Sequence, residues 1–320
     1  MEAVLTKPKI LMLGFWKNFR SAWSRRNSEE TLTGYLLISP ALILFLVFGV
    51  YPFYRTIAYS FTSWDGISSS STWLGLQNYQ IAFSGADPLW WKSLQNGVFF
   101  AVTALIFMNG IALCLAVAVD QKIRGQSIYR SIFYLPTILS GVVVAIIWKW
   151  LYQPIGGPIN QLLTTFGLGS LATAWLADIN TVRWAVSIAS IWMGIGSPFL
   201  LFLAGLQSVP VELYEAGRLD GANGRQLFWY ITLPFLIPVA TILSVLTILG
   251  AMQIFNLVLA MTNGGPGSAT EVPVLNIYRQ AFKFAEFGYA TALSMIFGTL
   301  LFTISIFQMW LSRKIGIRAA

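Results

Sequence analysis

A polar segment at residues 215–234 interrupts a sequence in which charged side chains are scarce. Glu215, Arg218 and Asp220 lie close together in it, with small residues among them. Carboxylates and a guanidinium at this spacing can form ion pairs with another surface, and small neighbours let that surface approach closely. The segment is therefore a candidate docking surface for another protein. The simpler alternative is an elbow that only joins two apolar runs.

The chain offers little for catalysis or metal binding. It has no histidine, and its single cysteine, Cys114, lies inside an apolar run. It has no GxxxxGKS/T phosphate loop, so the sequence predicts no P-loop nucleotide site in this chain. The apolar runs carry no pair of carboxylates and no Ser–His pair. We therefore expect no catalytic residues, no metal site and no cofactor bound by this chain; a membrane-embedded enzyme is the rival class.

Membrane-spanning helices are the elements that would position the polar segment. Hydrophobic residues make up 56% of the 320 residues and charged residues 10%, and the mean hydropathy is +0.68. A soluble domain averages about 25% charged residues, whereas a bilayer span needs about 20 apolar residues. The first apolar run begins too far from Met1 to be a cleaved signal peptide, so we expect it to remain as an anchor. Six runs qualify: Tyr35–Ala58, Val98–Val119, Ile132–Leu151, Trp184–Leu206, Phe235–Leu259 and Ala290–Leu311.

The distribution of Lys and Arg predicts the orientation of these spans. If the N-terminus is cytoplasmic, 14 of the 20 basic residues fall on the inner side. Both termini and the polar segment are therefore predicted to be cytoplasmic. The net charge of +8 reflects this bias and not nucleic-acid binding.

The residues around the polar segment predict two short helices joined by a tight turn. Pro210 suits a first helical position, and Glu212 suits the positive end of the helix dipole. Gly221 is suited to end this helix in a left-handed conformation. Asn223 or Gly224 can begin the second helix, which we expect to run to a break at Pro234.

Uncharged polar and aromatic side chains within two spans are candidates for a translocation pathway. Ser190 and Trp192 lie beside Gly194 in the fourth span, and Gln253 and Asn256 lie in the fifth. Hydrogen-bonding groups and aromatic faces suit a hydroxyl-rich ligand such as a sugar. The alternative is that the polar residues link helices and that Trp192 only packs.

The polar segment resembles the EAA motif of binding-protein-dependent ABC importer permeases. That motif reads EAA, then G, and then I-x-LP. Glu215, Ala216 and Gly221 match its first half, and a second group matches the remainder: Ile231, Leu233 and Pro234. Gly217 departs from the third position, which is a small-for-small change that affects only local helix stability.

Other motifs resemble the MalF/UgpA-like branch of the carbohydrate-uptake permeases. Asn263-Gly264-Gly265-Pro266-Gly267, with Thr262 and Thr270, is similar to the T-x-GGPG…T loop of that branch. The resemblance extends from about Gly34 to the last span. Further matches are Tyr51-Pro52, Ser60-Phe61, Asn78-Tyr79, Asn96, Tyr134-Leu135-Pro136 and Phe287-Gly288-Tyr289-Ala290 with Ala292.

The resemblance implies an all-α membrane fold with six transmembrane helices, both termini inside, of the type I importer (MetI-like) permease class. It also implies that the helix at Pro210–Gly221 is a coupling helix. The residues expected to contact the ATPase are Glu215, Ala216, Gly217, Asp220, Gly221 and Ala222. By analogy with the maltose permease, it places Ser190, Met193 and Gly194 on the substrate pathway, beside Trp192, Gln253 and Asn256.

Partners and location follow from the same resemblance. They are a MalG-like second permease, two cytoplasmic ATPase subunits that bind ATP and Mg, and an extracytoplasmic binding protein, assembled in the bacterial inner membrane. The expected cargo is a sugar or a related glycoside or polyol, moved by alternating access. Glycerol phosphate or a compatible solute such as glucosylglycerol is the alternative cargo, and an ion-coupled secondary carrier is the alternative outside the class.

The chain is expected to have three parts. Residues 1–31 form a basic cytoplasmic segment in which Leu11, Phe15, Phe19 and Trp23 recur at helical spacing. This predicts an amphipathic helix on the inner leaflet, with a mobile basic tail as the alternative. Residues 32–312 are the transmembrane permease domain, with its cytoplasmic coupling loop at 207–234. Residues 313–320 are a cytoplasmic tail.

Overall fold

The computed structural model describes residues 28–121 and 125–316. The proposed amphipathic segment around Leu11–Trp23 and the last four residues lie outside these ranges. The chain divides into two compact units, Met1–Ala58 and Tyr59–Ala320, which are described separately.

The described part of the first unit is one long apolar helix with a widened turn. α2 covers Ser28–Phe45, the wide turn covers Leu46–Val50, and α3 covers Tyr51–Tyr59. The Tyr51 N–H bonds the carbonyl of Leu46, five residues back. This widening lies just before Pro52, whose ring would crowd the carbonyl of a regular turn. The stretch is exposed on all sides within its unit, as expected for a helix that packs against lipid or another chain.

The regular elements among the described residues of the second unit are helices, apart from one isolated bridge between Thr62 and Trp73. The connecting turns include a wide turn at Ala104–Met108, a second at Phe228–Thr232 and a single 3₁₀ turn at Gly169–Leu171. The helices are α4 Gln77–Phe83, α5 Pro88–Thr103, α6 Asn109–Asp120, α7 Gln126–Ile138, α8 Gly141–Leu151, α9 Pro158–Thr165, α10 Val182–Gly194, α11 Gly196–Gln207, α12 Val211–Leu219, α13 Gly224–Leu227, α14 Leu233–Met252, α15 Asn256–Met261, α16 Pro273–Phe282 and α17 Phe287–Gly316.

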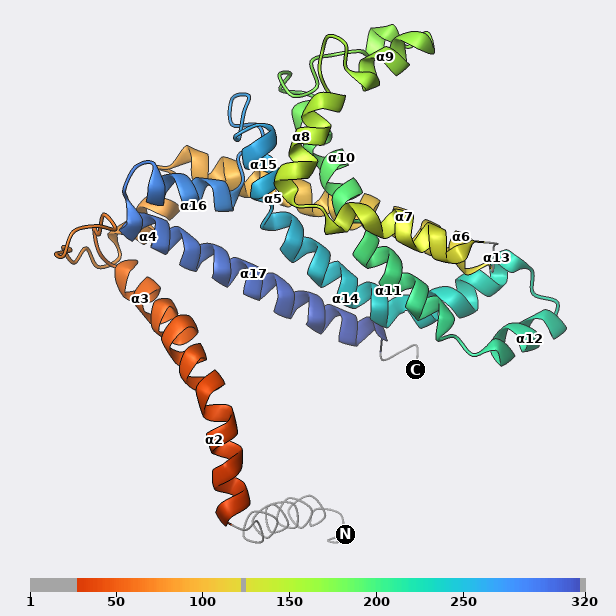
Figure 1. Ribbon diagram of the computed structural model, residues 1–320, viewed down its shortest axis with the longest axis horizontal. Coiled ribbons are helices and arrows are strands. Elements are labelled where there is room, and N and C mark those ends of the chain that lie inside the picture. Colours follow the sequence, from red (N-terminus) through yellow and green to blue (C-terminus); the bar gives the residue numbers. More distant parts are fainter. Residues whose placement is uncertain (1–27, 122–124, 317–320) are drawn as a thin grey trace, which may run out of the picture. The chain divides into compact units, whose positions relative to one another are not determined.

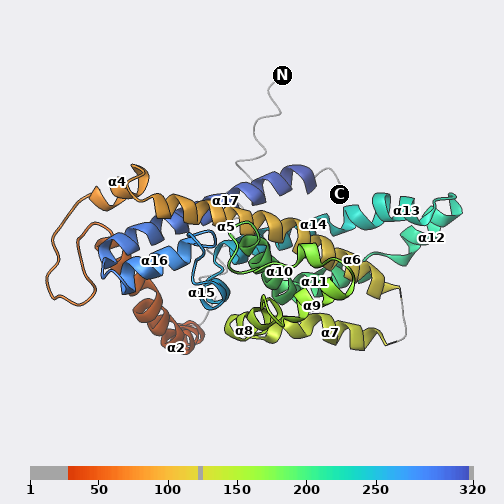
Figure 2. The same cartoon turned by 90° about the horizontal axis from the view of Figure 1, so that it is seen from above.

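Within the second unit, α14 lies beside α11 and α17 in both views (Figures 1 and 2). α11 packs against α6, α7 and α14, and α14 also packs against α5 and α17. Ala112 and Ala116 of α6 are completely buried in one cluster with Phe199 and Leu203 of α11. Small side chains let helix backbones approach closely where the hydrophobic effect cannot drive association, as in a bilayer.

Four described segments are long and apolar enough to span a membrane alone: Leu32–Tyr59, Pro88–Asp120, Gly224–Met261 and Phe287–Ser312. Two helix pairs qualify only together. α7 and α8 meet at 99°, and α10 and α11 meet at 48°. Up to six spans result if each bent pair counts as one. The third and fourth predicted spans, Ile132–Leu151 and Trp184–Leu206, correspond to these bent pairs.

The sharp bend between α7 and α8 has a local cause. Pro136 lies in the last turn of α7, and Leu139 and Ser140 have extended backbones. The Ser140 hydroxyl then accepts a bond from the Val143 N–H at 3.4 Å, which caps α8. Proline ends the first helix and serine starts the second, so this span cannot be straight.

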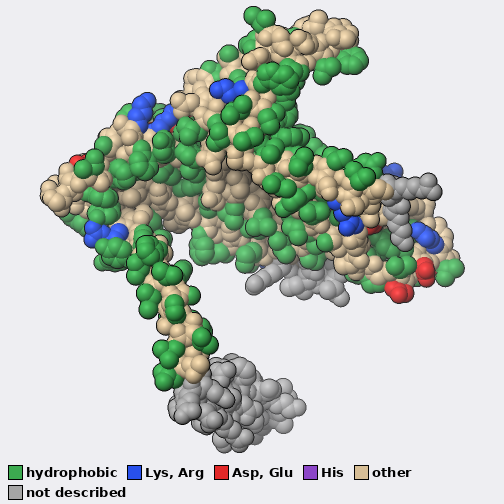
Figure 3. All heavy atoms as spheres, viewed as in Figure 1, with side chains coloured by type: hydrophobic (Ala, Val, Ile, Leu, Met, Phe, Trp, Pro, Cys, Tyr) green, Lys and Arg blue, Asp and Glu red, His purple; other side chains and the backbone are tan. Residues whose placement is uncertain are grey.

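The surface of the second unit matches a membrane setting. Hydrophobic side chains cover the flanks of its helices, and most acidic side chains visible in Figure 3 gather at the end where α12 lies. Ile146 of α8 is 63% exposed and Phe302 of α17 is 67% exposed. An apolar surface of this extent is unusual for a soluble monomer and normal against lipid or another subunit.

Candidate functional site

α12 has the cap structure that its sequence predicts. Pro210 is the residue before the helix, so the expected start was one residue early, and Glu212 lies in the first turn. Gly221 has φ +81°, its N–H bonds the carbonyl of Arg218 at 3.1 Å, and the Ala222 N–H bonds that of Gly217 at 2.9 Å. The left-handed glycine thereby supplies donors to carbonyls that the helix leaves open.

The second helix begins as expected and ends differently. Asn223 caps α13: its side chain accepts from the Gln226 N–H at 3.0 Å, and Gln226 returns a bond at 2.8 Å. The expected break at Pro234 is absent, because the chain continues through the wide turn Phe228–Thr232 into α14. The Leu233 N–H bonds the Phe228 carbonyl, five residues back. A turn of this width accommodates the proline ring and the N–H that proline lacks.

The outer surface of α12 is uncovered. The charged groups of Glu215, Arg218 and Asp220 make no ion pair within residues 28–121 and 125–316. Two apolar residues of the same helix, Val211 and Leu219, are 64% and 89% exposed. Of the remaining predicted contact residues, Ala216 and Gly221 are exposed, and Gly217 and Ala222 are partly covered. Val211 and Leu219 thus leave apolar surface exposed beside charged groups that have no ionic partner in the described ranges.

Gly217 is more than a neutral replacement for alanine. A Cβ at this position would lie 2.7 Å from Cδ2 of Leu227 and 3.2 Å from Cδ1 of Ile231. The sequence indicated only a small loss of helix stability at this position. The structure adds a packing reason, because a glycine lets α12 approach the segment that leads into α14.

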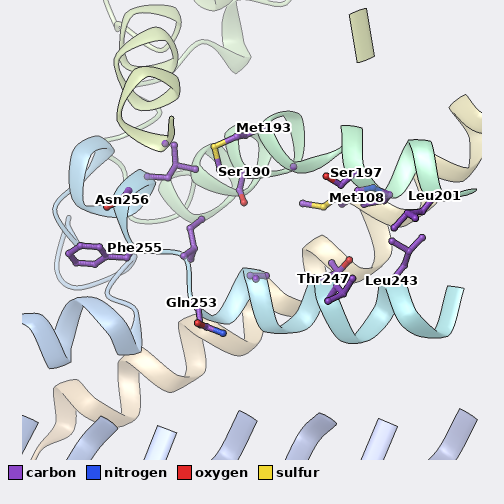
Figure 4. A pocket seen from close by; sticks show the side chains of 18 residues that line it. Met108, Ser190, Met193, Ser197, Leu201, Leu243, Thr247, Gln253, Phe255 and Asn256 are labelled. Atoms are coloured by element: carbon purple, nitrogen blue, oxygen red, sulfur yellow. The ribbon is translucent and has the colours of Figure 1, made fainter. Parts of the chain in front are cut away.

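A pocket of about 420 Å³ lies where three helix breaks converge (Figure 4). Gly141 begins α8 after the first break, Gly194 ends α10 before the second, and Gln253–Phe255 separate α14 from α15. α10 and α11 form one wall and α14 the opposite one (Figure 4). Interrupted helices leave backbone and side-chain polar groups available to line a pocket between apolar helices.

Five of the six expected pathway residues line this pocket: Ser190, Met193, Gly194, Gln253 and Asn256. The side chains of Gln253 and Asn256 are exposed and make no hydrogen bond within the described part of the chain. Ser197 adds a hydroxyl, whereas the Thr247 hydroxyl is engaged by donating to Oδ1 of Asn109 at 3.2 Å, and no described residue that lines the pocket is charged. Free amides and hydroxyls among apolar side chains suit a neutral, hydroxyl-bearing ligand.

Trp192 lies elsewhere. It lines a separate, almost wholly apolar pocket of about 710 Å³, together with Trp148 and Trp184. Its ring meets that of Trp148 at 71°, with the centroids 5.9 Å apart. Trp192 is therefore not next to Ser190 and Asn256, and its arrangement is that of a packing residue.

The GGPG loop, residues 262–271, is closed by its own polar groups. The hydroxyls of Thr262 and Thr270 are 2.7 Å apart, and Thr270 also donates to the Gly265 carbonyl at 2.9 Å. The Asn96 amide of α5 donates to the carbonyls of Ser268 and Glu271, at 3.1 and 2.8 Å. Residues that marked the family resemblance thus hold this loop against α5.

An ion pair that the sequence did not indicate anchors the same loop. Arg279 of α16 lies 2.7 Å from Oε2 of Glu271, and it also donates to the Asn263 carbonyl at 2.6 Å. Glu271 is fully buried, and its Oε1 has no partner among the described residues. Burial raises the pKa of Glu271 to about 7, and the opposing effects of Arg279 and Lys283 offset this only in part. The sequence offered one indication of this ion pair: an acidic residue and an arginine lie on either side of Pro273.

Comparison with known proteins identifies the family. Residues 110–317 match the family described as binding-protein-dependent transport system inner membrane component. The chain is 31% identical to the multiple sugar-binding transport system permease protein MsmF of Streptococcus mutans, over 89% of this chain and 96% of that protein. It is 34% identical to the sn-glycerol-3-phosphate transport system permease protein UgpA of Brucella abortus, over 86% of this chain and 92% of that protein.

The fold has a counterpart among crystal structures. A bacterial ABC transporter involved in the import of the acidic polysaccharide alginate gives a TM-score of 0.76 at 23% identity, over 94% of this chain and 99% of that one. Fold and family together define a helical membrane permease, which is a transport component and not an enzyme. The chain belongs to the binding-protein-dependent transport system inner membrane components, and the family resemblance seen in its motifs is confirmed.

Proposed function

We propose that this chain is the MalF-like permease subunit of an ABC importer that carries a neutral sugar or a related glycoside or polyol by alternating access. It has six spans with both termini in the cytoplasm of a bacterial cell, and it works beside a MalG-like permease. Two ATPase subunits bind ATP and Mg on the cytoplasmic side, and an extracytoplasmic binding protein delivers the cargo.

The uncharged pocket carries the proposal on cargo. Its polar groups are free amides and hydroxyls, chiefly those of Gln253, Asn256, Ser190 and Ser197, and none of its described residues is charged. A phosphorylated or acidic cargo needs cationic groups, because burying an unpaired anion is costly. The pocket therefore favours a neutral sugar over glycerol phosphate, the cargo in the name of UgpA.

Uptake into proteoliposomes that hold the complete importer tests the cargo. We expect Asn256→Ala and Gln253→Ala to lower the uptake of a labelled neutral sugar at least tenfold, because each removes a bond to a cargo hydroxyl. The sugar is chosen by a thermal-shift screen of the binding protein. Gln161→Ala, which changes an exposed amide on α9, is the matched control. Uptake of glycerol phosphate that exceeds sugar uptake would contradict the proposal.

The proposal for α12 is that it docks on an ATPase subunit. Its support is the exposed surface formed by Glu215, Ala216, Arg218 and Asp220, whose charged groups have no ionic partner in the described ranges. A Cβ at Gly221 meets nothing within 4 Å, so a larger side chain there disturbs a partner and not the rest of this chain. We expect Gly221→Leu to abolish ATP-driven uptake while Gly221→Ala, with the same backbone cost, retains it. Equal uptake by the two variants would overturn the docking proposal.

A further inference from the structure

Two residues of α12 are partly covered by the rest of the described chain. Every residue from Val211 to Leu219 is exposed except Tyr214 and Gly217. These two residues are three apart, so they lie on one face of the helix. Around them, a pocket of about 490 Å³ extends between α12 and the ends of α6 and α11, lined in part by Asp120 and Leu206. The helix therefore stands off the bundle and does not lie flat against it.

Both covered residues contact the same short segment. The Tyr214 hydroxyl is 2.9 Å from Oγ1 of Thr232, and Gly217 lies against Leu227 and Ile231. Thr232 is 5% exposed, and its hydroxyl also reaches the Leu227 carbonyl at 3.4 Å. A displacement of α12 therefore acts on residues 227–232, as well as on α11 through the short connection that contains the buried Val209.

That segment has an irregular backbone at the point where it leads into α14. The turn Phe228–Thr232 is wide, and Pro234 cannot donate to the carbonyl of Tyr230. A second proline, Pro238, lies one turn further on. Wide turns and prolines are the usual sites of helix bending. A push on this segment can therefore tilt α14, which forms one wall of the cargo pocket.

We infer that the Tyr214–Thr232 hydroxyl bond is a positioning contact that transmits movement of α12 to α14. The inference rests on the proposed docking of an ATPase subunit on α12. The Gly217 contact is apolar and allows sliding, whereas a hydrogen bond is directional and fixes the register of the two segments. When the Tyr214 hydroxyl is removed, the Thr232 hydroxyl still donates to the Leu227 carbonyl. No buried donor is left without an acceptor, so the fold is retained.

The movement is measured without knowledge of the cargo. Gly250 lines the pocket on α14, and a Cβ there meets nothing within 4 Å. Gly250→Cys in a Cys114→Ser background is labelled by a membrane-impermeant maleimide in the complete importer, with and without a non-hydrolysable ATP analogue. The parent reporter is expected to change its labelling rate several-fold on addition of the analogue.

Three variants decide the inference. Tyr214→Phe and Thr232→Val should abolish the nucleotide-dependent change in labelling, and Thr232→Ser, which keeps the hydroxyl, should retain it. The amount of ATPase subunit that co-purifies should equal that of the parent in all three. A full nucleotide response in Tyr214→Phe overturns the inference, and so does loss of the ATPase subunit from that variant. Failure of the docking proposal is separate, because it appears as normal uptake by Gly221→Leu.

Discussion

The GGPG loop and α12 are both polar segments between apolar helices, yet they are built in opposite ways. In the GGPG loop, Glu271 is fully buried and ion-paired with Arg279, and Asn96 reaches across from α5. On α12, the charges of Glu215 and Asp220 have no ionic partner within the described ranges. The hydrophobic side chains of Val211 and Leu219 beside them are exposed. The polar groups of the GGPG loop are paired within the chain, whereas the charged groups of α12 have no ionic partner among the described residues.

The difference separates stability from function. A buried polar group that loses its partner destabilises the fold, because its desolvation is no longer offset. An exposed group that has no partner within the chain contributes little to folding and is available to another subunit. Substitutions in the GGPG loop should therefore appear in unfolding experiments, and substitutions on α12 should appear in assembly and transport.

Removal of Arg279 should have the largest effect on stability. Arg279→Ala leaves a buried carboxylate unpaired, and we expect it to lower the free energy of unfolding by about 3–5 kcal/mol at pH 8. Denaturant titration of the purified protein in detergent measures the change. The double variant Glu271→Leu with Arg279→Met removes both charges and should recover most of the loss. A loss below about 1 kcal/mol in the single variant would show that the ion pair does not hold the loop.

The pH dependence of stability tests the raised pKa of the Glu271 carboxyl. The pKa of Glu271 rises from 4.5 in the unfolded chain to about 7 in the fold, so between these values the folded state binds more protons. Stability should therefore fall as pH rises from 5 to 8, by about 3 kcal/mol for a shift of this size. The chain has no histidine, and Asp65, whose pKa is lowered to about 2 by the Ser68 hydroxyl, changes charge far below this window.

Glu271→Gln is the control for this slope. It keeps the shape of the side chain and cannot ionise, so its stability should not fall between pH 5 and pH 8. A slope in the variant equal to that of the parent would assign the pH dependence to other groups.

Two glycines with nearly equal φ angles, one in each segment, allow a matched comparison in which the expected effects on stability are smaller. Gly221 has φ +81° and Gly264 has φ +80°, but a Cβ at Gly221 meets nothing, whereas one at Gly264 overlaps the Glu271 carboxylate. Alanine should cost about 1 kcal/mol at Gly221 from backbone strain alone. At Gly264 we expect a further loss of about 1–2 kcal/mol, because the ion pair must shift. Equal losses in thermal unfolding would contradict the difference between the two segments.

Local chemistry explains which features the sequence could predict. The left-handed Gly221 and the cap at Asn223 depend on a few neighbouring residues, and both were read correctly. The course of the chain after Thr232 was predicted wrongly, because a proline can either end a helix or follow a wide turn that keeps the helix continuous, and the residue type alone does not distinguish these outcomes. The buried state of Glu271 likewise depends on α5, which lies far away in the sequence.

Helical geometry would have refined the expected pathway. Ser190, Met193 and Gly194 lie on one face of α10 at spacings of three and four, whereas Trp192 is two residues from Ser190 and points to the opposite side. The structure places the first three in one pocket and Trp192 in another. Residue type suggested Trp192, whereas the family resemblance suggested Met193 and Gly194, and spacing within the helix separates the tryptophan from the other two.

The smallest expected effect on stability is at the surface of α12, where the contrast with the buried ion pair of the GGPG loop is greatest. Glu215→Gln and Asp220→Asn should change the free energy of unfolding by less than about 0.5 kcal/mol, because neither carboxylate has an ionic partner in the described chain. Each should nevertheless reduce the amount of ATPase subunit that co-purifies, since the ion pairs that it forms across the interface are lost. Glu286→Gln, which changes an exposed acid just before α17, is the matched control and should leave co-purification unchanged. Reduced stability with unchanged ATPase binding would contradict this view, because it would show that the α12 carboxylates stabilise this chain and do not bind another subunit.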